Sequence, residues 1–354
     1  MAYFQLCNIF AKKISRMRIV GLGNALTDVL ARLHSDECFD EMGLLKGGMQ
    51  LIDEEKLLRI MSVFEGLETT LASGGSAANA VSGVARMGIE SGFIGKIGRD
   101  AYGRFFREDM ERNGVQTLLI EGEQASGCAM TMITPDGERT FGTFLGAAAT
   151  LCAEELSAEM FEGYDILHIE GYLVQDTSLI LRAVQLAKEA GLSVSFDMAS
   201  YNVVKDNYAI IRDLVENYVD ILFANEEEAL AYTGEEPRKA TEILSRYCRI
   251  AVVKCGAQGS FVGCEGIITE VPATPEVRVD STGAGDLYAS GFLYGLSQNC
   301  SLGVCGAIGS LLAGRVIKVI GTKMSDEIWT EIKLKVSSMA VSYTHLTLPT
   351  NSRV

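Results

Sequence analysis

Proline and positive charge are both scarce in this chain of 354 residues. It has 5 prolines against 37 glycines, a ratio that suits tight turns between strands and helices better than flexible linkers. It has 31 lysines and arginines against 46 aspartates and glutamates, which gives a formal net charge of −15. Because binding along a nucleic-acid backbone needs a basic surface, this balance argues against a nucleic-acid partner. Backbone N–H groups and one or two cations can still bind a single phosphate group in an acidic protein.

Cysteine pairs and long apolar runs are also missing. The 9 cysteines are odd in number and include no C-x-x-C pair, so we expect reduced thiols in a cytoplasmic protein, without a zinc site or a disulfide framework. No run of about 18 uncharged apolar residues occurs, as a membrane span would need. The most apolar late stretch, Leu302 to Gly321, is interrupted by Arg315 and Lys318 and is typical of a core helix. We therefore expect no membrane partner.

Short apolar runs alternate with amphipathic stretches, and a composition of 48% hydrophobic and 22% charged residues allows a sizeable core. We expect strands at residues 17–23, 92–97, 165–169, 193–197, 221–224 and 250–254. We expect helices at residues 54–65, 76–87, 102–113, 177–190, 208–217, 226–232, 238–247 and 287–297. This alternation predicts βαβ units, and hence an α/β fold in which helices cover both faces of a mainly parallel sheet.

Two zones in the N-terminal half break the alternation and are β-like and rich in turns. They lie within about residues 29–52 and 115–146, and Pro135-Asp136-Gly137 is a strong hairpin-turn signal in the second zone. We interpret both zones as strands of a small accessory sheet that could cover a cleft as a lid. The alternative is that they extend an edge of the main sheet.

The two ends of the chain differ from the rest. Residues 1–16 lack the apolar run and the cleavage site of a secretory signal, and we expect them to be an upstream extension outside the fold. The domain would then span residues 17–340. Residues 341–354 continue no helical pattern and resemble translated sequencing-adapter read-through, so we expect a non-native tail and assign no function to His345.

The run Asp-Ser-Thr-Gly-Ala-Gly-Asp at 280–286 precedes a predicted helix. A helix N-terminus presents N–H groups without intrahelical partners and a partial positive charge. The small residues Gly283, Ala284 and Gly285 would let a phosphate group approach this backbone closely. Asp286 would then lie in the first turn, where a carboxylate can accept a proton from an attacking hydroxyl group. The alternative is a glycine-rich turn in which Asp286 is only an N-terminal helix charge.

A second glycine-rich run, Ala-Ser-Gly-Gly-Ser-Ala-Ala-Asn-Ala at 72–80, also precedes a predicted helix. Gly74 and Gly75 permit close contact with a ligand, and Asn79 can donate to and accept from neighbouring hydroxyl groups. The alternative is a plain turn before a helix of small residues that packs on the sheet.

An acidic run follows the predicted strand at 221–224. Asn225 and Glu228 are three residues apart and would share one helix face, where oxygen ligands can organise a hydrated Mg²⁺ ion near a triphosphate. The alternative is an N-cap followed by acidic residues in the first helical turn.

Two further turns follow predicted strands. Lys254 begins a glycine loop that either borders a nucleotide or only makes a hairpin. The run Gly-Leu-Gly-Asn-Ala-Leu-Thr-Asp at 21–28 is not a dinucleotide-binding fingerprint, because Leu26 stands in place of the third glycine. Asn24 and Asp28 instead end a strand at the face where open α/β sheets bind ligands, and Asp28 could hold a pair of sugar hydroxyl groups. The alternative is a polar turn between the sheet and the lid.

Taken together and in this order, these motifs resemble the ribokinase-like (PfkB) family of sugar and nucleoside kinases. The resemblance covers about residues 17–335, with signatures at 74–79 and 280–286. The runs at 21–25 and 134–140 look most like the adenosine-kinase-like branch. The resemblance implies a three-layer α/β/α domain with a small β lid, and transfer of the γ-phosphoryl group of ATP to a primary hydroxyl group.

The resemblance also implies roles for individual residues. Asp286 matches the catalytic base, and Gly283, Ala284 and Gly285 match an anion hole. Asn225 and Glu228 match the motif that organises Mg²⁺ through water, and Asn225 also counts among the nucleotide-binding residues. Asn24, Asp28, Gly74, Gly75 and Asn79 match substrate-binding positions, and Lys254, Gly256, Gly259 and Thr282 match positions beside the nucleotide. Some members also bind a monovalent cation such as K⁺ beside the aspartate that opens the second signature, here Asp280.

No Walker lysine motif occurs in the chain, so other groups must supply positive charge for the phosphates. We expect it from the backbone amides at 283–286, from Mg²⁺ and from Arg139 in the lid zone.

The choice of substrate rests on two tyrosines. Tyr172 and Tyr201 each follow a predicted strand and fall where the resemblance implies aromatic residues around a purine base. The alternative is ordinary packing of two half-buried tyrosines. We favour a nucleoside or ribose-like sugar over a hexose or keto-sugar, the substrates of fructokinase-like or ketodeoxygluconate-kinase-like members. A monomer and a lid-mediated homodimer are both open.

Two other classes of protein stay open. The chain could be a nucleotide-binding homologue without turnover, although such a binder would not need the complete loop with Asp286. An oxidoreductase would suit the βαβ rhythm and the pair Gly21 and Gly23, but Leu26 and the absence of a strong ribose-binding signature weaken that reading.

Overall fold

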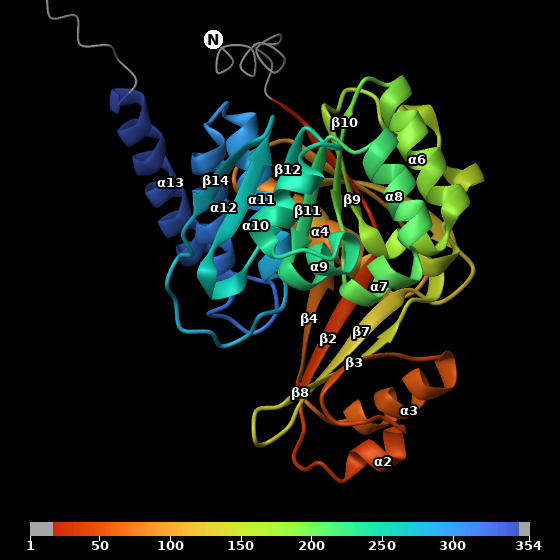
Figure 1. Cartoon of the computed structure of the whole chain (residues 1–354). Helices are drawn as coiled ribbons and strands as arrows, with labels where there is room; N and C mark the ends of the chain where they lie inside the picture. Colours follow the sequence, from red (N-terminus) through yellow and green to blue (C-terminus); the bar gives the residue numbers. More distant parts are fainter. Residues whose placement is uncertain (1–16, 347–354) are drawn as a thin grey trace, which may run out of the picture. The chain divides into compact units, whose positions relative to one another are not determined.

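The computed structural model describes residues 17–346, and Figure 1 shows their helices and strands. These residues form two compact units. The N-terminal unit consists of residues 19–82 and 91–194, and the C-terminal unit consists of residues 17–18, 83–90 and 195–346.

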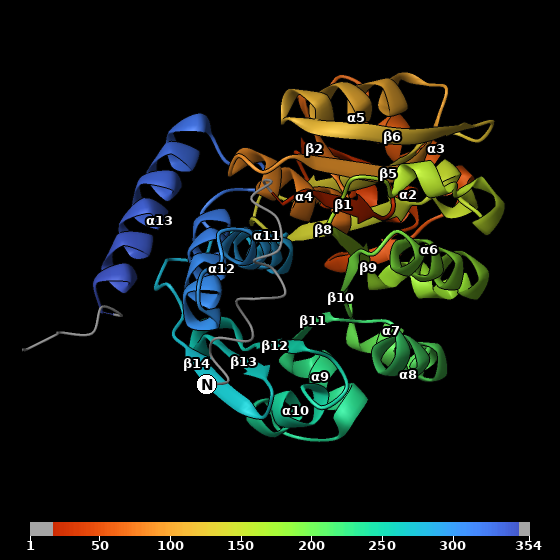
Figure 2. The ribbon, with the colours of Figure 1, turned by 90° about the horizontal axis from the view of Figure 1, so that it is seen from above.

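A parallel arrangement of four strands forms the centre of the N-terminal unit. The order is β9-β1-β5-β6, with all neighbours parallel. The strands are β1 (Ile19–Leu22), β5 (Ser91–Gly98), β6 (Val115–Gly122) and β9 (Ile166–Glu170). All residues of β1, β5 and β9 are buried, as expected for strands covered on both faces. Helix α5 (Ala101–Arg112) packs on β6 (Figure 2), and α6 (Thr177–Glu189) follows β9.

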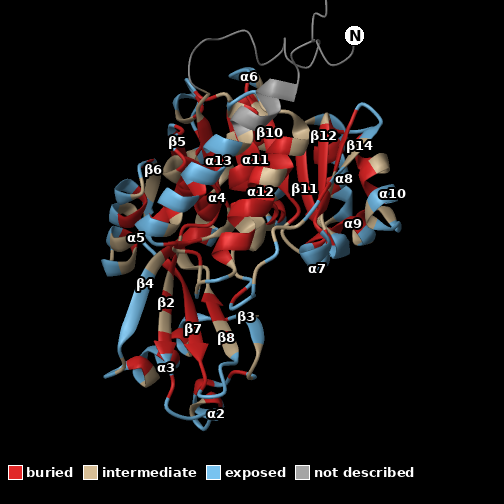
Figure 3. Ribbon diagram, turned by 90° about the vertical axis from the view of Figure 1, so that its left-hand side faces the viewer, coloured by how far each residue is buried: buried red, intermediate tan, exposed pale blue. Residues whose placement is uncertain are grey.

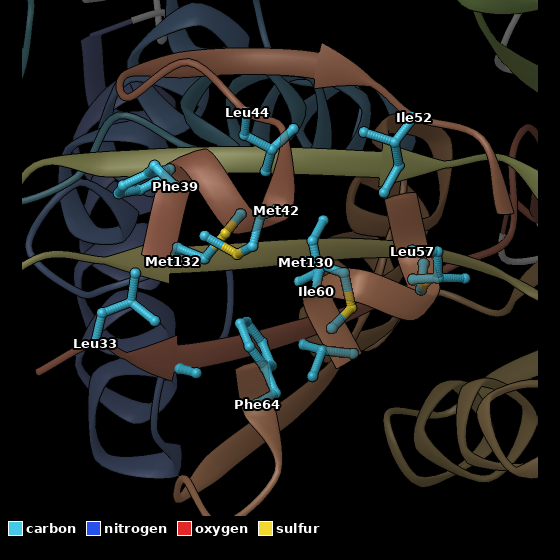
Figure 4. Packing of buried hydrophobic residues seen from close by; sticks show 13 residues of the cluster. Leu33, Phe39, Met42, Leu44, Ile52, Leu57, Ile60, Phe64, Met130 and Met132 are labelled. Atoms are coloured by element: carbon cyan, nitrogen blue, oxygen red, sulfur yellow. The ribbon is translucent and has the colours of Figure 1, made fainter. Parts of the chain in front are cut away.

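The same unit contains a separate five-stranded sheet in the order β3-β8-β7-β2-β4, which we call the lid sheet. Its strands are β2 (Leu26–Arg32), β3 (Gly48–Leu51), β4 (Thr69–Gly74), β7 (Gly127–Ile133) and β8 (Arg139–Phe144). Helices α2 (Cys38–Met42) and α3 (Glu54–Phe64) contribute Phe39, Met42 and Ile60 to a core shared with Met130 and Met132 of β7 (Figure 4). The predicted accessory sheet is therefore confirmed, and the alternative of an edge extension is wrong.

The lid sheet departs from the predicted zones in three places. Strand β4 lies outside both zones, because it is an edge strand whose first three residues are exposed and carry no apolar alternation. Strand β6 lies inside the second zone but pairs with β5, so it belongs to the main parallel sheet. Helix α2 stands where the first zone predicted strand. Its residues Phe39 and Met42 are three apart, so a short helix buries both side chains in the lid core.

The C-terminal unit carries the later strands and helices of the alternation. Strands β10 (Ser193–Asp197), β11 (Ile221–Asn225) and β12 (Ile250–Lys254) are parallel, and β13 (Ser260–Cys264) and β14 (Ile267–Val271) are antiparallel. Helices α7 (Tyr201–Asp206) and α8 (Tyr208–Asn217) follow β10, and helices α9 (Glu226–Thr233) and α10 (Pro237–Leu244) follow β11. Helix α4 (Ser76–Arg86) begins in the N-terminal unit and ends in this one. The predicted α/β fold with a mainly parallel sheet is confirmed.

Helices α11 (Ala284–Ser297) and α12 (Leu302–Val316) pack so closely that their backbones touch. A methyl group on Gly291 would lie 2.6 Å from the carbonyl oxygen of Ile308. Leu287 continues this contact into a core that includes Leu312 and Trp329, and Figure 3 shows the buried residues along both helices. This packing fixes the position of α11 within the unit.

The last helix, α13 (Asp326–Leu346), is not among the helices that the sequence predicted. The expectation that no helix continues past residue 340 is wrong for residues 341–346, and residues 347–354 and 1–16 lie outside the described residues. Among the helices of residues 17–346, none has both the length and the apolar character needed to cross a membrane. The short 3₁₀ helices are η1 (Gly146–Thr150), η2 (Ala153–Glu155), η3 (Ala158–Met160), η4 (Gly171–Gln175) and η5 (Gly256–Gln258).

Candidate active site

The N-terminus of α11 has the geometry that the sequence predicts. The helix begins at Ala284, and its N-cap Gly283 has a φ of 73° in the left-handed region. A methyl group on Gly283 would lie 2.5 Å from Thr322 Cγ2, so this turn requires glycine. The N-cap glycine has no side chain to cap the helix, the Ala284 amide donates to the Ser281 carbonyl oxygen (3.2 Å), and Asp286 lies partly exposed in the first turn. A phosphate group could therefore bind to backbone N–H groups at this helix end.

Asp280 fixes the loop that leads into α11. Its Oδ1 accepts hydrogen bonds from the Thr282 amide (3.0 Å) and from Thr282 Oγ1 (2.8 Å). Its Oδ2 accepts a hydrogen bond from the Gly321 amide (2.7 Å). Thr282 is thus engaged in shaping the loop, and its contact with a nucleotide stays a prediction, as does a monovalent cation beside Asp280.

Lys254 lies beside the same helix end. Its ammonium group is 2.8 Å from Asp197 Oδ2, and the two side chains are 14% and 8% exposed. A methyl group on Gly285 would lie 3.1 Å from Lys254 Nζ. Lys254 therefore brings a cation to the glycine loop, and the role expected for Arg139 stays a prediction. Asp197 was missed as a functional residue, although a carboxylate that ends an apolar strand was a usable signal.

Several carboxylates surround this cation. Burial alone would lower the pKa of Lys254, but the charges of Asp197, Glu228 and Asp286 outweigh that effect and raise the pKa. Burial and, after it, the charge of Asp197 raise the pKa of Glu228 to about 7, although Lys254 offsets part of the rise. The site is therefore rich in negative charge, and Lys254 keeps its proton at neutral pH.

Asn225 and Glu228 bond to each other at the start of α9. Glu228 Oε2 accepts from the Asn225 amide (2.7 Å), Glu228 Oε1 accepts from Asn225 Nδ2 (2.6 Å), and Asn225 Oδ1 accepts from the Glu228 amide (2.8 Å). The N-cap interpretation is confirmed, and it leaves the metal role open. Because the oxygens already accept hydrogen bonds, they fit a hydrated Mg²⁺ better than a directly coordinated ion. Among residues 17–346, no group of three or more His, Cys, Asp or Glu side chains gathers as a metal site.

The loop after Lys254 is a hairpin between β12 and β13. Gly256 and Gly259 have φ values of 51° and 93°. A methyl group on Gly259 would lie 2.0 Å from the carbonyl oxygen of Val271, so glycine is required there. The hairpin is confirmed, and the contact of these glycines with a nucleotide stays a prediction.

The predicted substrate residues of the N-terminal unit form contacts with one another. A methyl group on Gly74 would lie 2.4 Å from Asp28 Oδ1, and one on Gly75, where φ is 98°, would lie 2.2 Å from the Asn24 carbonyl oxygen. Asn24 and Asn79 are both buried. Asp28 does not end a strand as predicted: it lies within β2 of the lid sheet, opposite Ala72 of β4. The lid sheet thus supplies one of the expected hydroxyl-binding groups.

Glu170 connects these residues and was missed from the sequence. It is 1% exposed at the end of β9. Its Oε1 accepts from the Asn24 amide (2.9 Å) and from Asn24 Nδ2 (2.6 Å), and its Oε2 accepts from the Ala77 amide (3.0 Å). A buried carboxylate thus joins the turn after β1 to the first turn of α4. A glutamate at the end of an otherwise apolar strand was the available signal.

The two tyrosines predicted to stack on a base belong to different units. Tyr172 is half-buried in η4. Tyr201 is 42% exposed at the start of α7, with the Lys205 ammonium 5.2 Å from the centre of its ring. Lys205 thus lies over the Tyr201 ring, and stacking of either tyrosine on a purine stays a prediction.

Comparisons with known proteins agree with this fold and identify a family. A family model described as pfkB family carbohydrate kinase matches residues 42–329. The crystal structure of adenosine kinase from Sinorhizobium meliloti is 32% identical with a TM-score of 0.79, covering 91% of this chain and 100% of that chain. The probable sugar kinase from Rhizobium etli is 31% identical with a TM-score of 0.80, covering 92% of this chain and 100% of that chain. The 5-dehydro-2-deoxygluconokinase of Listeria monocytogenes is 30% identical over 301 residues, covering 80% of this chain and 91% of the relative.

The fold and site define a phosphotransferase that acts on an alcohol group. The chain belongs to the pfkB family of carbohydrate kinases, with the ribokinase-like three-layer α/β/α fold. It is a sugar or nucleoside kinase, and membership implies ATP as phosphoryl donor, typically with Mg²⁺. The oxidoreductase alternative is therefore wrong.

Proposed function

We propose that this chain transfers the γ-phosphoryl group of Mg-ATP to a primary hydroxyl group of an adenosine-like nucleoside. The observation that carries the proposal is the start of α11, where a helix N-terminus with glycine at its N-cap, the carboxylate of Asp286 and the ammonium group of Lys254 occur together. Such a site can bind a phosphoryl group and accept a proton, which are the two needs of this transfer.

Each part of the C-terminal unit would have one task. Asp286 would accept the proton of the attacking hydroxyl group. The backbone at Gly283, Ala284 and Gly285 would donate hydrogen bonds to the transferring group. Mg²⁺, held through water by Asn225 and Glu228, would neutralise charge on the phosphates. Gly256, Gly259 and Thr282 would border the nucleotide.

The N-terminal unit would bind the acceptor. Asp28 and Asn79 would hold its hydroxyl groups, Gly74 and Gly75 would allow close approach, and Asn24 would be held in place by Glu170. Carboxylates accept hydrogen bonds from neutral hydroxyl groups and repel phosphate groups. This set of side chains therefore favours an uncharged polyol such as a ribose ring.

The choice of a nucleoside rests on two supports. The adenosine kinase of Sinorhizobium meliloti is 32% identical to this chain, and the match covers the whole of that kinase. Tyr172 and Tyr201 offer aromatic faces for a base. The Listeria relative named as a 5-dehydro-2-deoxygluconokinase supports the second candidate, a keto-sugar or hexose kinase of the fructokinase-like or ketodeoxygluconate-kinase-like kind.

A phosphorylation screen distinguishes the candidates. The protein is incubated with Mg-ATP and one acceptor per reaction: adenosine, fructose or ketodeoxygluconate. The mass of each acceptor is then measured by mass spectrometry. We expect adenosine to gain one phosphoryl group. Phosphorylation of a sugar alone would establish the second candidate, and binding of Mg-ATP with no phosphorylated acceptor would favour a non-catalytic homologue.

The lid sheet bears on the oligomeric state. Its edge strand β3 exposes Met49 and Leu51, and its other edge strand β4 exposes Leu71. Exposed apolar side chains on strand edges favour pairing with another copy, so they support the lid-mediated homodimer over the monomer. Sedimentation velocity of the protein and of a Met49→Lys/Leu51→Lys variant would test this, and a wild-type monomer would contradict it.

A further inference from the structure

Asp197 has both carboxylate oxygens committed. Oδ2 pairs with Lys254 Nζ at 2.8 Å, and Oδ1 accepts a hydrogen bond from the Ala199 amide at 3.0 Å. The orientation of the carboxylate is therefore set by its own backbone turn, and that orientation in turn sets where the ammonium group lies. Asp197 therefore positions the ammonium group of Lys254, and the hydrogen bond from the Ala199 amide fixes the carboxylate of Asp197.

The turn that holds Asp197 is strained. Ala199 has a φ of 67°, a left-handed conformation that is unfavourable for a residue with a Cβ atom. The Ser200 amide donates to the Met198 carbonyl oxygen (2.9 Å), and the Met198 amide donates to Phe223 (3.0 Å), so neighbouring bonds enforce this conformation. Strain of this kind persists where surrounding structure imposes it, and it is concentrated at functional sites.

The charges around Lys254 exceed what a structural ion pair needs. One partner would suffice to neutralise a buried ammonium group, but Asp197, Glu228 and Asp286 all act on this one. The carboxylates outnumber the cation, so pairing with Asp197 alone does not account for the arrangement. The ammonium group also lies against Gly285 in the first turn of α11, where a methyl group would be 3.1 Å away.

We propose that Lys254 is a catalytic residue of phosphoryl transfer and that Asp197 is the positioning residue that places its ammonium group beside α11. The proposal rests on the proposed function. In the step, the acceptor oxygen bonds to the γ-phosphorus while the bond from that phosphorus to the β–γ bridging oxygen breaks. ADP leaves with the electron pair, and the acceptor proton passes to Asp286. Lys254 keeps its proton and stabilises the negative charge on the transferring group.

A planar mimic of the transferring group tests this without knowledge of the acceptor. The affinity for Mg-ADP is measured by calorimetry with and without aluminium fluoride, for the wild type, Lys254→Met, Lys254→Arg and Asp197→Asn. In the wild type we expect aluminium fluoride to tighten binding. In Lys254→Met that gain should fall by about 10²–10³-fold, as for loss of one oxyanion donor, whatever change the substitution makes in the affinity for Mg-ADP alone. Asp197→Asn should lose part of the gain, and Lys254→Arg should keep part of it.

A matched ion pair controls for stability. Lys96 Nζ lies 2.7 Å from Glu155 Oε1 in the N-terminal unit, with side chains 10% and 27% exposed. Lys96→Met should lower the unfolding temperature as Lys254→Met does, but it should leave the gain from aluminium fluoride intact. If Lys254→Met does not fold, the Asp197→Asn/Lys254→Met double variant removes both charges and takes its place.

The outcomes separate the two proposals. A full gain in folded Lys254→Met or in the double variant would overturn the role of Lys254. A full gain in Asp197→Asn with a reduced gain in Lys254→Met would overturn the positioning role alone. A wild type that binds no Mg-ADP, or that shows no gain, would overturn the proposed function and this inference with it.

Discussion

Two glycine-rich turns, each followed by a helix, look alike in the sequence and differ in the structure. The turn before α11 leaves the helix N-terminus without a side-chain cap and lies against the ammonium group of Lys254. The turn before α4 lies against Asp28, and the Ala77 amide in the first turn of α4 already donates to buried Glu170.

This difference in the groups around each turn suits the two turns to different ligands, the phosphates of the donor and the hydroxyl groups of the acceptor. A helix end beside a cation favours the phosphates of the donor once Mg²⁺ offsets the carboxylates Asp197, Glu228 and Asp286 around Lys254. A helix end whose amide is taken by a carboxylate favours neutral hydroxyl groups, which donate to carboxylates. The glycine pattern shows where a ligand can approach, and the buried side chains around it decide which ligand.

The largest expected effect comes from removing the base beside α11. Asp286→Asn should lower kcat by about 10²–10⁴-fold, because an amide cannot accept the hydroxyl proton. The affinity for Mg-ADP should change little, since the glycine loop stays intact. Steady-state kinetics with calorimetry would measure both, and a variant with most of its kcat would remove Asp286 from the mechanism.

The corresponding change in the acceptor turn should act on stability and on the acceptor. Glu170→Ala leaves the donors of Asn24 and Ala77 without a partner, and should lower the free energy of unfolding by about 2–4 kcal/mol. KM for the acceptor should rise, whereas affinity for Mg-ADP should persist. Urea unfolding followed by circular dichroism would measure the first effect. An equal loss of Mg-ADP affinity would contradict the separation of the two turns.

The metal role is tested with a paired substitution. Asn225→Ala/Glu228→Ala should raise the Mg²⁺ concentration needed for half-maximal activity by about 10–100-fold, as for loss of groups that orient metal-bound water. Asp53→Ala, which removes the N-cap of α3 that accepts from the Lys56 amide, is a control for the loss of a cap alone. If the two variants gave the same Mg²⁺ titration as the wild type, the pair would be only structural.

A smaller effect is expected at the N-cap of α11. Gly283→Ala and Gly234→Ala both force alanine into the left-handed region, at a cost of roughly 1–2 kcal/mol. Only at Gly283 does the added methyl group also meet Thr322, at 2.5 Å, whereas at Gly234 it meets no atom within 4 Å. Thermal unfolding should show a larger loss for Gly283→Ala, together with weaker Mg-ADP binding. Equal losses and unchanged binding would show that the shape of this turn is unimportant.

The smallest effect is expected at the C-terminus. Within residues 326–339, the part of α13 whose burial is described, Trp329, Ile332 and Val336 are buried in the core, so a chain of residues 17–340 should stay folded and active. The fluorescence of Trp329, the single tryptophan, would follow unfolding. A control truncated after Lys335 loses Val336 and should unfold at lower temperature. Insoluble protein from the 17–340 chain would show that the ends were misread.

The sequence predicts the elements of this fold better than the partners of its side chains. Strands such as β10 and helices such as α8 lie where the apolar periodicity places them, because that pattern depends on neighbours along the chain. The edge strand β4 and the short helix α2 were missed, since packing within the lid sheet stabilises them. Glu170 and Asp197 were missed for a related reason: their partners are 146 and 57 residues away.

The most direct test is the mass of adenosine after incubation with Mg-ATP and either the wild type or Asp286→Asn. We expect the wild type to add one phosphoryl group to adenosine, with an equal amount of ADP formed, and the variant to leave adenosine unchanged over the same time. ATP consumed by the wild type with no phosphorylated adenosine, fructose or ketodeoxygluconate, or equal product from the variant, would contradict phosphoryl transfer at the start of α11.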